Sequence, residues 1–553
     1  MRSWLQLFLL LCASASFAFA RVETPAREFD LQKFIDGALA AGKKEITVPP
    51  GRYRVVPSHG RHLSLKKLNN VTIIADGVEL VCTQTTRALE LEDCRNLTIR
   101  GLTIDYDPLP FTEGRITALA PDKSWIEFEL FDGYPEKVGT QIELFDAKTE
   151  QLKSLTHFGW TGLTQLDGRR YRVSKHAGYV SNAKDDREEV GDLVVANSED
   201  APGGWVAHAI MGTRCVNLRL EDVTLYASNC FSFFETDCDH STYLRCRLIP
   251  RPLETDPVPR AHRRLRSGNL DAFHSKYALG GPQLIDCTAR FQGDDCVNIC
   301  GDYTFVAGSS GNTLRVLLHH PLNIAAGSPV ELVSYTGTRL PDAKVLAITD
   351  AGEITEPERA FIAAQRMDRT LQSKLTTANT RAVTLTLDRP VDLPIGSVVA
   401  STERMGNGFL IQGCDFGFNR SRGILIKASH GKILGNTVTA TWGPALLIAP
   451  EWWWLESGSA DDLEIRANVL RDCRTTSIVV TARGGNGALA PAGAHQNLTL
   501  VENRITGSPL PAMSLSSTAG LRIDRNTFPA ASDSPQKSIH LENCTDITGS
   551  NRL

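Results

Sequence analysis

Three aspartates lie close together in the middle of the sequence. Asp271 is followed 23 residues later by the adjacent pair Asp294 and Asp295. Paired carboxyl groups are the minimal apparatus for glycoside hydrolysis, because one protonates the leaving oxygen while another activates water. Three carboxyl groups that share a small space cannot all ionise cheaply, so at least one pKa should rise toward neutrality, as a general acid requires. The sequence therefore predicts an acid–base site, provided that the fold brings the three side chains together.

Further polar residues lie beside these aspartates or between residues 422 and 451. If the substrate is a sugar, such side chains are candidate ligands for its hydroxyl groups. Long polar side chains on a protein surface are more often simply solvated, and this alternative stays open for each of them. The candidates are His274, Lys276, Asn298, Arg422, Lys427 and Glu451.

Four tryptophans fall within 13 residues, next to Glu451. Indole rings can stack on the apolar face of a pyranose, and they can equally form a hydrophobic cover over a core. We expect Trp442 and, from the triple Trp452-Trp453-Trp454, Trp453 to face the substrate, with the other rings in the cover.

The elements that must position these residues are short strands with a recurring pattern. Alternating apolar residues are followed by a small or polar residue and a second apolar pair, and we expect no amphipathic helices between the copies. The copies recur at 23 residues or more, which is typical of a parallel β-helix whose coils stack over a shared core. The clearest copies are Asn96–Ile104, Asn217–Leu225, Leu463–Asn468, Leu498–Ile505 and Leu521–Asn526.

Two stretches interrupt this pattern. Residues 108–205 and 304–402 contain alternating strands typical of small antiparallel barrels, and we predict that both are β domains inserted into solenoid loops. Apolar residues at helical spacing from Leu31 to Leu39, closed by Gly42, predict an N-terminal capping helix. The predicted units are thus a leader at 1–20, cap and first coils at 21–107, the first insertion at 108–205, catalytic coils at 206–303, the second insertion at 304–402, and C-terminal coils at 403–553.

The solenoid prediction determines how the aspartates can meet. A separation of 23 residues, about one coil, would place Asp271 and Asp294 on adjacent coils about 4.8 Å apart. With Val297 pointing inward, strand parity would turn Asp295 toward the core. Both members of the pair reach one site only if the strand begins after Asp295, at a turn or bulge, and Gly293 makes such a turn plausible. Asp-rich turns that bind Ca²⁺ or cap loops remain the alternative to catalysis.

The composition narrows the class of protein. The 59 Lys and Arg residues against 63 Asp and Glu residues give a net charge of −4, so no nucleic-acid partner is indicated. Arg2, the apolar run from Trp4 and the small residues up to Ala20 predict a secretory signal cleaved after Ala20, hence a secreted or periplasmic protein without a membrane span. The 13 cysteines are better explained by packing inside coils than by a disulfide framework. No metal or nucleotide motif is present, so we expect neither a metal nor a cofactor.

The motifs resemble those of a known enzyme family. An Asn-x-Asp motif followed one coil later by Gly-Asp-Asp-Cys is similar to the pattern of polygalacturonase-like inverting glycosidases on right-handed parallel β-helices. The closer resemblance is to glycoside hydrolase family 110, the exo-α-1,3-galactosidases, and it extends over most of the chain after residue 20, including both insertions. The segments that carry it are Leu102–Phe111, Asn269–Ser275, Gln292–Asn298, Arg422–Lys427 and Gly443–Glu451.

The resemblance implies direct displacement by water on a glycan with a terminal α-galactose. The resemblance implies that Asp294 is the general acid and that Asp271 and Asp295 hold the water. The Gly-His-Gly loop and the Arg-x-Lys pair of polygalacturonases have no counterpart here, because Arg422 and Lys427 lie five residues apart. A neutral sugar therefore fits better than a uronic acid. A polygalacturonase-like hydrolase, a polysaccharide lyase and a non-catalytic glycan-binding solenoid remain alternatives, and the sequence leaves the oligomeric state open.

Overall fold

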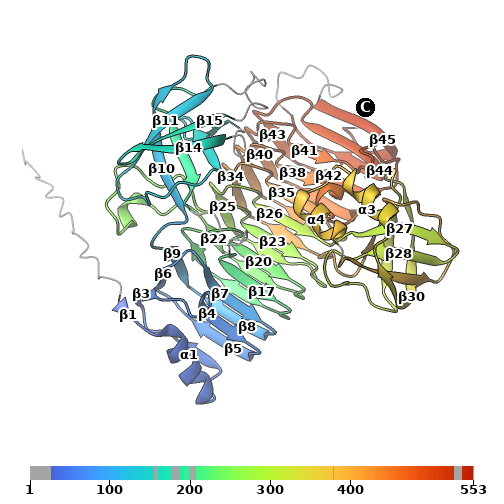
Figure 1. Cartoon of the computed structure of the whole chain (residues 1–553), viewed down its shortest axis with the longest axis horizontal. Helices are drawn as coiled ribbons and strands as arrows, with labels where there is room; N and C mark the ends of the chain where they lie inside the picture. Colours follow the sequence, from blue (N-terminus) through green and yellow to red (C-terminus); the bar gives the residue numbers. More distant parts are fainter. Residues whose placement is uncertain are drawn as a thin grey trace, which may run out of the picture.

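The computed structural model describes residues 27–154, 160–175, 187–198, 207–377, 379–528 and 538–551. Its architecture is a right-handed parallel β-helix with three faces, as the sequence predicts. Figure 1 shows the coils stacked from the N-terminal end in blue to the C-terminal end in red. The predicted signal segment, residues 1–20, lies outside the described residues. Among the helices that the structure describes, none combines the length and apolar composition needed to span a bilayer.

The first face carries the strands that follow the three aspartates. Its strands are β4 (Arg61–Lys66), β7 (Arg87–Glu92), β17 (Ile210–Thr213), β20 (Phe233–Thr236), β23 (Phe273–Lys276), β26 (Val297–Cys300), β35 (Ile424–Lys427), β38 (Leu446–Ile448) and β41 (Ile478–Val480). Two longer strands, β44 (Met513–Asp524) and β45 (Ile539–Thr548), continue from this face into the next.

The second and third faces complete each coil. The second face consists of β2 (Glu45–Thr47), β5 (Asn69–Ile74), β8 (Arg95–Arg100), β18 (Arg219–Glu221), β21 (Thr242–Leu244), β24 (Gln283–Ile285), β33 (Leu410–Gln412), β36 (Lys432–Leu434), β39 (Asp461–Arg466) and β42 (His495–Val501). The third consists of β1 (Arg27–Glu28), β3 (Gly51–Val55), β6 (Val78–Cys82), β9 (Thr103–Tyr106), β19 (Thr224–Leu225), β22 (Arg247–Leu248), β25 (Thr288–Arg290), β34 (Asp415–Gly417), β37 (Thr437–Thr439), β40 (Val469–Arg471) and β43 (Arg504–Thr506).

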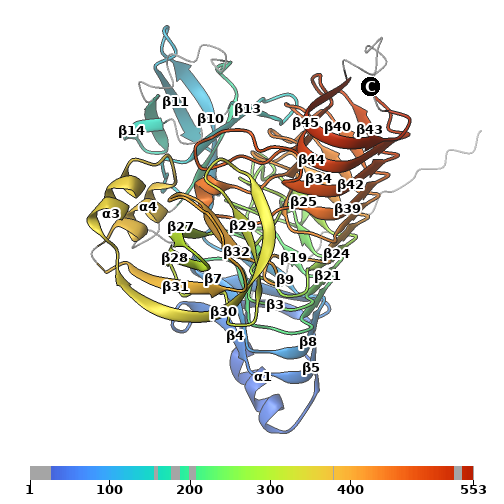
Figure 2. The same cartoon turned by 90° about the vertical axis from the view of Figure 1, so that its right-hand side faces the viewer.

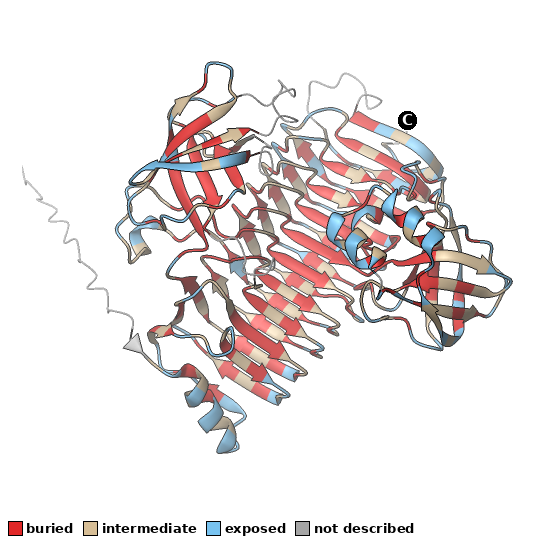
Figure 3. Cartoon of the chain, in the orientation of Figure 1, coloured by how far each residue is buried: buried red, intermediate tan, exposed pale blue. Residues whose placement is uncertain are grey.

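The core of the solenoid is a continuous column of apolar side chains, and the strands that enclose it are mostly buried (Figure 3). At one corner, buried asparagines form a ladder from coil to coil. The Asn468 side chain donates to the Ile433 carbonyl at 2.9 Å and to the Asn503 side chain at 2.9 Å, while its oxygen accepts from the Asn436 backbone at 2.9 Å. All twelve cysteines that the structure describes are unpaired, and eleven are buried. The cysteines therefore act as packing residues, as predicted.

The helix α1 (Leu31–Ala40) caps the N-terminal end of the solenoid, as the apolar spacing predicts. The Asp30 carboxylate accepts the backbone N–H of Lys33 at 2.9 Å and caps the helix. Leu31 and Ile35 are buried against the first coil, so the exposed end of the core column is covered.

Two insertions leave the solenoid after β9 and after β26, and both lie on the side away from the second face (Figure 2). The first is an antiparallel sheet of seven strands: β10 (Phe111–Leu119), β11 (Trp125–Leu130), β12 (Ile142–Phe145), β13 (Leu152–Ser154), β14 (Trp160–Asp167), β15 (Arg170–Lys175) and β16 (Leu193–Asn197). The second is a closed barrel: β27 (Thr304–Ser310), β28 (Thr313–Leu317), β29 (Pro329–Val333), β30 (Arg339–Glu353), β31 (Arg381–Leu387) and β32 (Val398–Ser401). Two helices in the second insertion, α3 (Glu356–Ala363) and α4 (Arg369–Thr376), were not predicted from the sequence.

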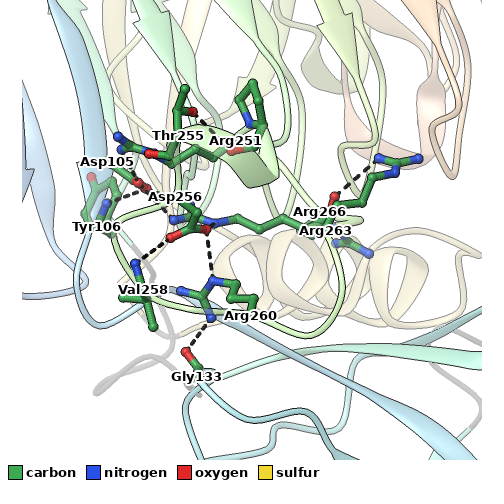
Figure 4. Close-up of polar contacts among 12 residues, drawn as sticks. Asp105, Tyr106, Gly133, Arg251, Thr255, Asp256, Val258, Arg260, Arg263 and Arg266 are labelled. Atoms are coloured by element: carbon green, nitrogen blue, oxygen red, sulfur yellow. Dashed lines mark hydrogen bonds and ion pairs between the residues drawn. The ribbon is translucent and has the colours of Figure 1, made fainter. Parts of the chain in front are cut away.

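A long connection between β22 and β23 links the solenoid to the first insertion through buried charges. It begins with the short helix η3 (Leu253–Thr255). Arg251 pairs with Asp105 of the third face at 2.9 Å, and Asp256 pairs with Arg260 at 2.9 Å (Figure 4). Arg260 also donates to the carbonyl of Gly133, in the first insertion. This connection leads directly into the coil that carries Asp271.

Candidate active site

The three aspartates meet on the first face, where one carboxyl oxygen from each lies within 4.8 Å of the other two. The register differs by one residue from the one predicted. Phe273 pairs with Val297, a separation of 24 residues, so Asp271 lies level with Asp295 and not with Asp294. The backbone N–H of Asp295 donates to the Asp271 carboxylate at 3.3 Å, and the Asp295 carbonyl accepts from Ala272 at 2.9 Å.

Asp294 and Asp295 both reach the site because the strand begins after them. β26 starts at Val297, so neither aspartate is bound by the alternation of the strand. A Cβ atom at Gly293 would lie 2.3 Å from the Asn269 carbonyl oxygen, so only glycine allows this close approach of the two coils.

The three carboxyl groups differ in exposure and in partners. The Asp294 side chain is 25% exposed, against 5% for Asp271 and 2% for Asp295, so Asp294 is the most accessible of the three. Asp294 pairs with Arg420 at 2.6 Å. Asp295 pairs with the Arg422 guanidinium at 2.9 Å and accepts the Arg422 backbone N–H at 2.8 Å.

Burial and mutual repulsion alter the protonation of this group. Burial, and then the Asp294 charge, raise the pKa of Asp271 well above its usual range. Burial raises the pKa of Asp295 to about 8; the Arg422 charge opposes this rise, and the charges of Asp294 and Asp271 add to it. The group therefore keeps at least one proton at neutral pH, as expected for carboxyl groups that share a site.

His274 is the direct partner of Asp271. Its Nδ1 lies 2.7 Å from the Asp271 carboxylate, and its ring stacks on Phe231 with centroids 4.4 Å apart. Burial lowers the pKa of His274 to about 4, although the Glu456 charge opposes the change. The ring is therefore neutral at neutral pH, and it fixes the orientation of Asp271.

A cluster of opposite charges lies next to the aspartates on the following coils. The Lys427 ammonium is fully buried and contacts Glu451 at 2.8 Å, Glu456 at 2.5 Å and the side-chain oxygen of Asn298 at 3.3 Å. Lys276 pairs with Glu456 at 3.5 Å. Burial raises the pKa of Glu456, but the charges of Lys427 and Lys276 outweigh it, so the net pKa falls below the usual range. The two lysines and two glutamates of this cluster therefore balance each other's charge.

A cavity of about 970 Å³ opens beside His274, between the first face and the second insertion. Trp454 lies in its wall, whereas Trp453 is not among its lining residues, although both rings are at least 40% exposed. Trp442, the other ring predicted to face the substrate, packs with the buried apolar cluster against the first insertion and carries Arg474 4.7 Å above its ring. The solenoid wall of the cavity includes Phe231, Phe234, His274, Lys276 and Glu456, and the wall from the insertion includes His320 and Leu371.

Three groups of described residues bring potential metal ligands within 4.8 Å of one another: the aspartates themselves, His274 with Cys300 and Glu456, and Asp302 with His319 and His320. In the third group the Asp302 carboxylate lies 2.5 Å from His320 and 3.4 Å from His319. These distances are those of ion pairs and hydrogen bonds. The contacts among Asp302, His319 and His320 therefore account for the position of this group.

Two residues that sequence reasoning missed are Arg420 and Glu456. Arg420 lies two positions before the predicted Arg422, and residues two apart in an extended segment share a face, so this spacing was an available signal. Glu456 joins Glu451 in an antiparallel bridge around the tryptophan triple, which folds as η4 (Trp452–Trp454). Glu456 could not be foreseen, because this turn has no signature in the alternation pattern.

No protein-family model matches the chain. Its relatives include the alpha-1,3-galactosidase A of Shewanella woodyi, which is 21% identical over 511 residues that cover 87% of this chain and 78% of the relative. The alpha-1,3-galactosidase A of Bacteroides thetaiotaomicron is 22% identical over 519 residues, 89% of this chain and 84% of its own. The alpha-1,3-galactosidase B of the same species is 21% identical over 583 residues, 94% and 87% of the two chains.

Solved structures with a similar course of the chain include a family 28 exopolygalacturonase from Yersinia enterocolitica, with a TM-score of 0.38, 11% identity and coverage of 95% of this chain and 76% of that one. A mannuronan C-5 epimerase A-module from Azotobacter vinelandii has a TM-score of 0.35 and 11% identity, and the match covers 96% of each chain. The sequence relatives extend over both insertions and the coils that carry the aspartates. Over most of its length, the chain is thus related to proteins named alpha-1,3-galactosidase, as its motifs indicated.

Proposed function

We propose that this protein is a glycoside hydrolase that releases terminal galactose from α-1,3 linkages at the ends of glycans. The observation that carries the proposal is the meeting of three carboxyl groups within 4.8 Å on one solenoid face, where His274, the partner of Asp271, lines a cavity. Such a group supplies both the acid and the base that glycosidic bond cleavage needs. The sugar and the linkage come from the names of the relatives.

In the proposed reaction, Asp294 protonates the glycosidic oxygen as the bond to the anomeric carbon breaks. Asp271 and Asp295 hold a water molecule, whose oxygen bonds to the anomeric carbon while its proton passes to one of these two carboxylates. The 25% exposure of the Asp294 side chain supports its role as the acid, since the other two lie deeper and the acid must touch the leaving group.

The raised pKa values constrain this assignment. In the protein without substrate, the proton rests on the buried pair, because burial raises the pKa of Asp295 to about 8 and also raises the pKa of Asp271 well above its usual range. The acid role of Asp294 therefore requires that the proton moves to the exposed carboxyl group when the leaving oxygen lies against it. A substrate that fills the site excludes water and favours this transfer.

The charge pairing supports a neutral sugar. Four cations around the aspartates each face a carboxylate: Arg420 faces Asp294, Arg422 faces Asp295, Lys427 faces Glu451 and Glu456, and Lys276 faces Glu456. A uronic acid would need one of these cations for its own carboxylate, and a lyase would need an unpaired lysine or arginine base. Neither need is met by the described side chains around this site, so galactose fits better than galacturonate.

The stereochemical outcome is the second element of the proposal. The resemblance in the motifs favours inversion, but facing carboxyl groups in inverting enzymes are roughly 6.5–9.5 Å apart, and those in retaining enzymes about 5–5.5 Å apart. The oxygens here lie within 4.8 Å, which favours retention if two of them face each other across the bond. We propose inversion, with water held by two adjacent carboxylates on one side, and keep a covalent intermediate on Asp294 as the second candidate.

The test is to incubate the protein with aryl α-galactosides and galactose-capped oligosaccharides and to follow the released sugar by NMR before mutarotation. Initial release of β-galactose supports the proposal. Initial release of α-galactose selects the covalent route. Inactivity on every α-galactoside overturns the hydrolase and leaves a glycan-binding solenoid, whereas an unsaturated product that absorbs in the ultraviolet identifies a lyase.

We also propose that the protein is exported and acts outside the cytoplasm. The support is the signal-like pattern of residues 1–20, which ends at Ala20. Mass spectrometry of the protein recovered from its native host tests this. An N-terminus at Arg21 is expected, and an intact leader in the active protein would contradict export by cleavage.

A further inference from the structure

Two buried carboxylates of the first insertion contact the segment that leads into the coil of Asp271. Glu113 on β10 accepts the backbone N–H groups of Leu265 at 2.9 Å and Arg266 at 3.1 Å. Glu143 on β12 pairs with the Arg266 guanidinium. The side chains of Glu143 and Arg266 are 1% and 4% exposed, so this contact is shielded from water.

Glu143 also contacts a second arginine, and that arginine reaches the aspartates. The Arg420 Nε atom lies 3.4 Å from the Glu143 carboxylate and donates to the Gly293 carbonyl. The Arg420 Nη2 atom lies 2.6 Å from the Asp294 carboxylate. Charges therefore alternate from Arg266 through Glu143 and Arg420 to Asp294.

We propose that Glu143 is a positioning residue for the reaction, through which the first insertion sets the orientation and the charge environment of Asp294. The inference rests on the proposed function in that Asp294 takes part in the reaction. It adds that a domain outside the solenoid, 151 residues earlier in the sequence, controls this carboxyl group. The role is independent of whether Asp294 acts as acid or nucleophile.

Glu143 can have this effect because its single carboxylate contacts two arginines, Arg266 and Arg420. A buried ion pair is costly unless each member has further partners, and removing one member leaves an uncompensated charge. With Glu143 present, Arg420 divides its attraction between two carboxylates and a carbonyl, so it is held in one geometry. Without the Glu143 charge, the attraction of Arg420 would be directed more strongly to Asp294, and the charge of Arg266 would be less well balanced.

The expected electrostatic effect on Asp294 has a definite sign. Loss of a negative charge next to Arg420 favours the ionised form of Asp294, so an acid at this position should lose its proton at lower pH. The other charged or titratable groups that act on Asp294 are unchanged by this substitution. These groups include Asp271, Asp295, Arg420, Arg422 and Cys230.

The test compares Glu143→Gln with a control in the same insertion. Glu127 on β11 is also buried and pairs with Arg170 and Arg172, whose side chains are 42% and 44% exposed, both within the insertion. Glu127→Gln therefore removes the charge of another buried glutamate of this insertion, one with more exposed partners, without touching the link to Asp294. We expect E143Q to lower kcat about 10- to 100-fold with KM within twofold, and to move the alkaline limb of the pH–rate profile to lower pH. We expect E127Q to leave all three quantities unchanged.

Matching behaviour of E143Q and E127Q would overturn the proposal. Glu143→Asp, which keeps the charge with a shorter reach, should restore part of kcat and return the pH profile toward that of wild type. If E143Q does not fold, Arg420→Lys takes its place, because lysine cannot bridge two carboxylates and a carbonyl in the same way. An unchanged kcat and pH profile in R420K would also overturn the proposal.

A measurement without substrate separates this inference from the proposed function. The titration of the Asp294 carboxyl carbon can be followed by ¹³C NMR in selectively labelled protein, with Asp294→Asn to assign the signal. A lower titration midpoint in E143Q supports the positioning role even if the wild type cleaves no α-galactoside. An unchanged midpoint contradicts it, whatever the activity.

Discussion

The Asp295 backbone N–H donates to the Asp271 carboxylate at 3.3 Å, across two adjacent coils. This contact ties the two deepest carboxyl groups of the site to the hydrogen-bond ladder of the solenoid. This contact lies just before the point where β23 and β26 begin to pair, so the stacking of the two coils helps to fix the distance between the two groups. A regular scaffold of this kind holds reacting groups more precisely than a loop would.

Replacement of the aspartates with asparagine should separate their roles when two leaving groups are compared. Asp294→Asn should reduce cleavage of a galactose disaccharide by about 10³-fold or more but reduce cleavage of a dinitrophenyl galactoside far less, because a good leaving group needs little protonation. Asp271→Asn and Asp295→Asn should reduce both reactions to a similar extent. Steady-state kinetics on the two substrates measures these losses. If D294N loses equal activity on both substrates, Asp294 is not the general acid.

Asp295 should make the stability of the protein depend on pH. Burial raises its pKa to about 8, against about 3.9 in an unfolded chain. Between these values the folded state keeps a proton that the unfolded state has lost, so stability falls as pH rises through this window. The amide side chain introduced by Asp295→Asn does not titrate. The free energy of unfolding of this variant relative to wild type should therefore increase from pH 5 to pH 8, by up to about 4 kcal/mol. The difference between the two melting temperatures should rise over the same pH range. A difference that does not vary with pH would contradict the raised pKa.

Trp454 should contribute more to substrate binding than Trp453. Trp454 lies in the cavity wall with His274 and Glu456, and Trp453 does not. Loss of a stacking ring removes about 0.5–1.5 kcal/mol beyond its area burial. Trp454→Ala should thus raise KM for a galactose-capped oligosaccharide about tenfold with little change in kcat. The same kinetics on Trp453→Ala decides between the two rings. A larger rise in KM for Trp453→Ala than for Trp454→Ala would support the expectation from the sequence that Trp453 faces the substrate.

The asparagine ladder should stabilise the solenoid without affecting catalysis. Asn468→Ala removes both donor bonds of the side chain and leaves the backbone N–H of Asn436 without its partner. Buried groups that lose a partner cost about 1–3 kcal/mol each. Urea unfolding should show a loss of that order, with kcat per folded molecule unchanged. Asn69→Ala, at an exposed position of β5, is the control and should stay within about 0.5 kcal/mol of wild type.

The fold was largely predictable because a solenoid repeats its own rules. The alternation in Leu498–Ile505 and Leu521–Asn526 marks inward-facing residues coil after coil, and each coil supports the assignment of the next. The helices α3 and α4 were missed because they lie inside an insertion whose strands dominate the local pattern. Their apolar faces are narrow, with Ile362 the only buried hydrophobic residue of α3.

The site was predictable only in part. The spacing of Asp271, Asp294 and Asp295 depends on a single coil, so one extra residue in the turn changed the register but not the meeting of the three. Glu143 and Glu456 escaped notice because they reach the site from an insertion and from the turn after the tryptophan triple. Contacts between segments more than a hundred residues apart follow from how domains dock, which no local pattern encodes.

The unpaired cysteines provide a built-in reporter of unfolding. Eleven of the twelve thiols that the structure describes are buried at positions spread along the solenoid, from Cys82 to Cys473. A thiol reagent can reach them only when a coil opens, so the labelling rate of each cysteine, resolved by peptide mass spectrometry, records the local opening free energy along the stack. The protein can thus be surveyed coil by coil without introducing a single probe.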